Sequence, residues 1–237
     1  MIPGQEQNHV PSLNLDSIRD CRQGDETMAL PLEVVLANNL WVIICGLLVF
    51  IMTVSVGFLE VGELGADMDI SLLKTMLITG SSIFFMAFVG FNPGSVLACN
   101  NSAMTVVLTT FLAAASSLLS IMYFRYRMIK KMPDLIYATN GVLMGLIIIT
   151  PLAGFVSPGS AVILGLIGGP LFLAGEKWFS RFKWFSDPVG LFPGHLLGGL
   201  FGVTMIAFFS QRTFAIASGN PVTPGNSPIP DGLLFGG

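Results

Sequence analysis

The sequence predicts an all-α integral membrane protein with about six transmembrane helices. Of its 237 residues, 53% are hydrophobic and only 11% are charged, whereas about a quarter of the residues of a soluble domain are charged. The apolar residues gather into six runs of about the length that a transmembrane helix needs. The lipid bilayer is therefore the first partner that we expect for this chain.

The apolar runs divide the chain into a membrane domain and two polar tails. The predicted spans are residues 39–59, 72–92, 102–124, 135–152, 159–175 and 192–210. The fourth and fifth spans are short, and the turn between them carries no charge, so a re-entrant pair of helices is an alternative to two full spans. Residues 1–38 form a polar N-terminal tail. Residues 211–237 form a Pro/Gly-rich C-terminal tail that we expect to lack regular structure.

The basic residues predict the orientation of the chain in the membrane. Eight of the eleven lie on the side that the chain reaches after spans one, three and five: Lys74, Arg125, Arg127, Lys130, Lys131, Lys177, Arg181 and Lys183. The positive-inside rule then places both termini on the outer, non-cytoplasmic side. The acidic residues of the predicted first loop, which include Glu60 and Glu63, count little in this rule.

Several classes of function lack support in the sequence. The basic residues form no stripe with interleaved aromatic side chains, so we expect no nucleic-acid binding. The three cysteines have no metal-ligand spacing, and we expect neither a metal nor a cofactor. The predicted spans contain no paired carboxylates and no nucleophile with a base beside it, so we do not expect an enzyme.

His195 is the candidate functional residue that the membrane segments single out. It lies in an uncharged apolar run, and the only other histidine, His9, belongs to the polar tail. A titratable group at bilayer depth is costly and therefore indicates a functional site by default. A neutral imidazole keeps one donor and one acceptor nitrogen there. The alternative is a histidine that packs between helices and bonds a neighbouring carbonyl.

Other residues of the spans predict structural roles. Asp187 precedes Pro188 at the predicted inner start of the last span, where a carboxylate complements the helix dipole. Pro151 is expected to end the fourth span. Small residues recur at a spacing of four, which lets membrane helices approach closely: Gly141 and Gly145, Gly165 and Gly169, Gly194 and Gly198, and Gly198 and Gly202. Gly198 belongs to two of these pairs and is the glycine that we expect to matter most for packing.

Four stretches, in order along the chain, resemble the ammonium transporter (Amt/Rh) family. They are the first span with Gly57-Phe58-Leu59-Glu60-Val61-Gly62, then Phe88-Val89-Gly90-Phe91-Asn92-Pro93-Gly94-Ser95, then residues 140–156, and finally residues 187–199. They are similar to the family's helix one, the outer end of its helix six, its helix eight with the following turn, and its helix ten.

The resemblance implies functional positions. Phe91 would match an outer gate phenylalanine, and Phe88 stands where the family usually has tryptophan. Ser95 would match the serine that helps to recruit ammonium, and His195 the second of two paired pore histidines. An aromatic face attracts an ammonium ion by a cation–π interaction. These four residues are the candidate binding residues for ammonium or ammonia if a pore exists.

The chain also departs from the family pattern. Family members have about eleven helices in two inverted repeats with the pore between them, whereas the resemblance here covers helix one and the second repeat. The first pore histidine, the partner gate phenylalanine and the recruiting tryptophan have no counterpart, and Gly190 replaces an aspartate. Identical copies inserted in one orientation cannot supply the inverted repeat.

The resemblance and the departures together predict a partial ammonium-transporter-like fold. They favour a non-conducting structural or accessory subunit that associates with other membrane subunits. The alternative is a channel or sensor for ammonium or ammonia that uses Phe91, Ser95 and His195.

Overall fold

The computed structural model describes residues 31–64, 68–130, 134–182, 187, 189–218 and 230–237. The chain divides into two units, residues 1–36 and residues 37–237. The contacts given below all lie within the second unit. Throughout the described residues the secondary structure is helical, with turns and no strand, which confirms the predicted fold class.

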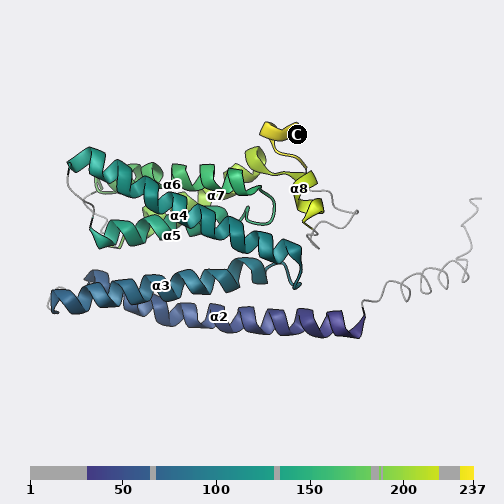
Figure 1. Cartoon of the computed structure of the whole chain (residues 1–237). Coiled ribbons are helices and arrows are strands. Elements are labelled where there is room, and N and C mark those ends of the chain that lie inside the picture. The colour runs from purple at the N-terminus through teal and green to yellow at the C-terminus, as the bar shows by residue number, and fades with distance from the viewer. Residues whose placement is uncertain (1–30, 65–67, 131–133, 183–186, 188, 219–229) are drawn as a thin grey trace, which may run out of the picture. The chain divides into compact units, whose positions relative to one another are not determined.

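The helices follow one another along the chain as Figure 1 labels them. They are α2 (Leu32–Leu64), α3 (Ile70–Gly94), α4 (Asn101–Ile129), α5 (Leu135–Ile149), α6 (Pro158–Phe179), the π-helix η1 (Phe192–Leu197), α7 (Gly198–Phe209), α8 (Arg212–Ala217) and the 3₁₀ turn η2 (Leu233–Phe235). Among the described residues, α2, α3, α4, α6 and the continuous segment Phe192–Phe209 are long and apolar enough to cross a membrane.

The fourth predicted span differs from this set. We expected a full span over residues 135–152, but α5 has 15 residues and is about 22 Å long at ~1.5 Å per residue, less than the ~30 Å of a bilayer core. Pro151 follows directly after its C-cap, Thr150, and it lacks the N–H that another helical turn would use. The chain continues from there as a turn.

Helix α2 is longer than the first predicted span at both ends. It begins at Leu32 instead of residue 39 and continues to Leu64, because no proline interrupts this stretch. Glu60 and Glu63, which we expected in a loop, therefore belong to its last two turns. At ~1.5 Å per residue, a helix of 33 residues is about 50 Å long and exceeds the bilayer core.

The core of the membrane unit forms where α4 contacts α5 and α6. Glycines allow this close approach: a Cβ added at Gly145 of α5 or at Gly165 of α6 would lie 2.4 Å from the same carbonyl oxygen, that of Ala113. Gly141 and Gly169 approach Ile121 of α4 in the same way. Two of the glycine pairs that the sequence singles out thus form the packing faces of this core.

Polar side chains buried in the core bond across helices. The Thr109 hydroxyl of α4 donates to the Ala153 carbonyl oxygen at 2.9 Å, and the Asn92 amide of α3 donates to the Thr110 hydroxyl at 3.0 Å. Such bonds in membrane proteins contribute about 0.6 kcal/mol on average. They also fix the rotation of each helix about its axis.

The C-terminal tail is partly ordered, contrary to the expectation that it lacks regular structure. Besides α8, its last residues form η2, and hydrogen bonds tie them to the end of α7: the Gly232 amide donates to the Ser210 carbonyl oxygen at 2.8 Å, and the Arg212 amide donates to Asp231 at 2.7 Å. Residues 219–229, like residues 1–30 of the N-terminal tail, lie outside the described residues.

Candidate functional site

The entry into the last membrane segment positions His195. Both carboxylate oxygens of Asp187 accept backbone hydrogen bonds at 2.9 Å, one from Leu191 and one from Phe192. Between them Gly190 has φ +68°, a conformation that favours glycine, and a Cβ there would lie 2.8 Å from the Phe172 ring. The π-helix that follows carries His195, and π-helical turns are frequent at functional sites.

His195 lies at the edge of a cavity of about 150 Å³. Four helices and the loop before the π-helix contribute its walls. The lining residues are Val56, Leu59, Glu60, Glu63, Phe84, Asn140, Leu143, Ile147, Phe172, Val189, Gly190, Leu191, Gly194 and His195. The cavity thus combines two carboxylates, an amide, an imidazole and two aromatic rings, with no Lys or Arg among these described lining residues.

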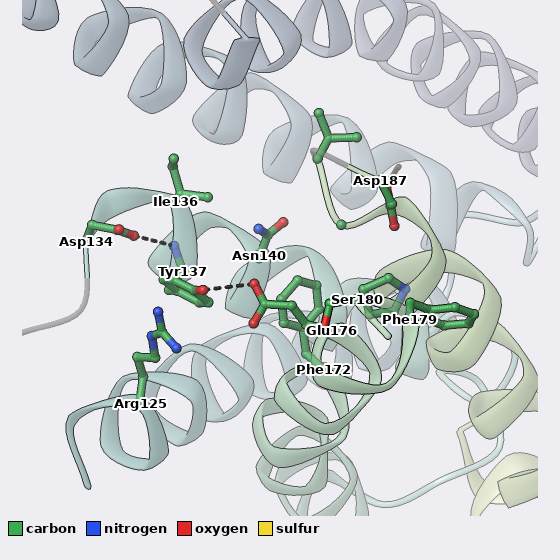
Figure 2. A pocket seen from close by; sticks show the side chains of 13 residues that line it. Arg125, Asp134, Ile136, Tyr137, Asn140, Phe172, Glu176, Phe179, Ser180 and Asp187 are labelled. Atoms are coloured by element: carbon green, nitrogen blue, oxygen red, sulfur yellow. Dashed lines mark hydrogen bonds between the residues drawn. The ribbon is translucent and has the colours of Figure 1, made fainter. Parts of the chain in front are cut away.

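A wider recess of about 570 Å³ adjoins this cavity and shares Asn140, Phe172, Val189 and Gly190 with it. Figure 2 shows the polar side of the recess. There the Tyr137 hydroxyl donates to Glu176 at 2.8 Å. The Arg125 guanidinium lies 3.9 Å from the centre of the Tyr137 ring, which is a cation–π contact.

The phenylalanines that we predicted as binding residues lie together on α3. The Phe88 ring contacts those of Phe84 and Phe91, with centroid distances of 5.1 Å and 5.6 Å. Phe88 is buried, whereas 40% of the Phe91 surface is exposed. Ser95 lies at the C-cap of the same helix, and its exposed hydroxyl donates to the Phe91 carbonyl oxygen at 3.0 Å.

The structure does not bring all of the predicted binding residues to one cavity. Phe88, Phe91 and Ser95 are absent from the described lining of the His195 cavity, and only Phe84 belongs both to the aromatic cluster and to the lining. The predicted structural residues lie nearby. Gly198 packs on α5, where a Cβ would lie 2.9 Å from the Met144 sulfur.

Comparison with known proteins gives the family of this chain. The model of the Ammonium Transporter Family matches residues 68–228. The chain belongs to this family. An ammonium transporter of Bacillus subtilis is 30% identical over 166 residues, which cover 70% of this chain and 38% of the relative. Amt2 of Archaeoglobus fulgidus is 29% identical over 160 residues, which cover 67% of this chain and 32% of the relative.

Solved structures agree with this assignment. The crystal structure of Saccharomyces cerevisiae Mep2 has a TM-score of 0.61 and 28% identity, and the match covers 67% of this chain and 35% of Mep2. A sensor Amt protein matches with a TM-score of 0.56 and 31% identity over 61% of this chain and 36% of that protein. The ammonium transporter family member described here thus spans little more than a third of the length of these relatives.

Proposed function

We propose that this member of the ammonium transporter family is a non-conducting subunit of a larger membrane assembly. One observation carries the proposal: within the described residues, the aromatic cluster with Phe91 and Ser95 and the cavity with His195 are separate sites. A family-type pore would need both in one path. The sequence also contains no second histidine after position 9 to pair with His195.

The arrangement of the basic residues supports an orientation for this subunit, with both termini on the outer side. Basic residues gather at the C-terminal ends of α4 and α6, where Arg127 and Lys177 occupy the last turns. By the positive-inside rule these ends face the inner side. A membrane-impermeant thiol reagent should then label Cys99, which is exposed after α3, but not an Arg181→Cys variant made in a Cys99→Ser background.

Purification of the tagged full chain from its native membrane in mild detergent tests the proposed assembly. We expect partner proteins in stoichiometric amounts that persist through size-exclusion chromatography. The same tag on an unrelated membrane protein of similar size is the control. A monodisperse lone chain would contradict the proposal.

A channel or sensor for ammonium or ammonia is the second candidate, and two observations favour it. The exposed Phe91 ring and the Ser95 hydroxyl oxygen lie at one end of α3, where a cation–π contact and an acceptor are both available. The resemblance to a protein described as a sensor Amt protein points the same way. If the chain supported ammonium uptake, this candidate would require His195→Ala to abolish it.

A further inference from the structure

The His195 cavity carries an excess of negative charge that no described side chain of its lining offsets. Glu60 and Glu63 line it from the last turns of α2. The charges of Asp187 and Glu60 repel that of Glu63, so three carboxylates lie near one another. Unpaired carboxylates are strongly unfavourable next to a membrane-buried cavity, and a positively charged occupant would offset their repulsion.

A buried amide without a hydrogen-bond partner points into the same space. Asn140 is 7% exposed, and its side chain makes no hydrogen bond within the described part of the chain. It lines both the cavity and the adjoining recess, and Figure 2 shows its amide apart from the hydrogen bonds drawn there. Buried polar groups are nearly always bonded, so the Asn140 oxygen is available to accept an N–H from an occupant.

The size and shape of the cavity narrow the class of occupant. A volume of about 150 Å³ is roughly ten times the ~10–15 Å³ that one water requires, so a molecule of a few heavy atoms fits. Among the described residues, no three His, Cys, Asp or Glu side chains converge as metal ligands. The rings of Phe84 and Phe172 add faces that attract organic cations.

We propose that this cavity binds a small protonated alkylamine, which enters from the side of the wider recess. The carboxylates of Glu60 and Glu63 balance its charge, the Asn140 oxygen accepts an N–H, and the aromatic rings cover its alkyl group. This site goes beyond the function proposed above, because it would serve a non-conducting chain as a ligand-binding site.

Calorimetric titration of the purified full chain in detergent with ethylammonium chloride, at fixed ionic strength, tests the site. We expect saturable binding at one site that equal concentrations of Na⁺ or K⁺ do not displace. Glu63→Gln and Glu60→Gln should each raise Kd at least tenfold. Glu33→Gln removes an exposed carboxylate from the first turn of the same helix and should leave Kd unchanged.

A second readout separates a binding role from a structural one. Because Glu63→Gln removes the repulsion from Asp187 and Glu60, it should leave the melting temperature of the ligand-free chain equal or higher while it removes the rise that ethylammonium causes. If Glu63→Gln does not fold, Glu60→Gln makes the same test. Absence of saturable binding, equal weakening by Glu33→Gln, or displacement by Na⁺ would overturn the proposal. Ammonium flux through the chain would instead contradict the non-conducting function and leave this site intact.

Discussion

The packing of α5 on α4 predicts that a single methyl group at Gly145 destabilises the protein. A Cβ there would lie 2.4 Å from the Ala113 carbonyl oxygen and 2.7 Å from the Ala114 Cα, both of them backbone atoms. Ordinary contact begins at 3.4 Å, so the two helices must separate by about 1 Å. Overpacking of this kind costs about 1–3 kcal/mol.

Gly199→Ala is the matched control for Gly145→Ala. Gly199 is also helical, but a Cβ there meets nothing within 4 Å. Both substitutions gain the same helix propensity, about 0.5–1 kcal/mol in water, so their difference isolates the steric contribution.

Thermal unfolding of both variants in detergent measures that difference. At about 2–4 °C per kcal/mol for a chain of this size, Gly145→Ala should melt roughly 2–12 °C below Gly199→Ala. Equal melting temperatures, with both variants folded, would refute the close contact between α4 and α5.

Three further predictions concern hydrogen bonds. Thr109→Val keeps the side-chain shape but removes the 2.9 Å bond to the Ala153 carbonyl oxygen, so it should cost about 0.6–1.7 kcal/mol in thermal unfolding; a neutral result would contradict this bond. Tyr137→Phe should cost about 1.5 kcal/mol, because the carboxylate of Glu176 loses its donor, whereas a Tyr123→Phe control, at an exposed position, should cost less. Hydrogen bonds from Ser71 lower the pKa of Asp69, so the stability that this carboxylate contributes is present above its unfolded pKa of about 3.9 and is lost as the pH falls through its lower folded pKa. An Asp69→Ala variant should therefore melt below the wild type at pH 6, and the gap should narrow towards pH 2; a gap that is independent of pH would contradict this role.

The number and type of the main elements could be predicted from the sequence because long apolar runs have few stable arrangements in a bilayer. The glycine spacing likewise predicts close packing, and the structure places Gly145 and Gly165 against one carbonyl of α4. The length of α5 was overestimated because hydropathy continues through Pro151, whereas the helical hydrogen bonds do not.

The lining of the His195 cavity was harder to predict, for two physical reasons. A charged residue usually marks the end of a span, so Glu60 and Glu63 were assigned to a loop, but α2 continues through them and turns them towards the cavity. Asn140 and Phe172 lie far from His195 in sequence, and only the packing of α5 and α6 brings them to it. The absence of a proline between residues 32 and 64 was the one sequence signal for the longer helix.

The resemblance identified the family correctly, but it assigned binding roles to positions that the structure separates. Phe91 and Ser95 carry the family motif at one end of α3, while His195 belongs to a cavity lined by residues outside that motif. A motif preserves the local sequence of each helix. It does not preserve the path between helices when part of the fold has no counterpart.

Ammonium flux into liposomes that contain the purified full chain tests the central claim most directly. The account predicts acidification or alkalinisation rates equal to those of empty liposomes, with an ammonium transporter of full family length, reconstituted in parallel, as the positive control. Flux above that of empty liposomes that His195→Ala removes would contradict a non-conducting role and establish the channel instead.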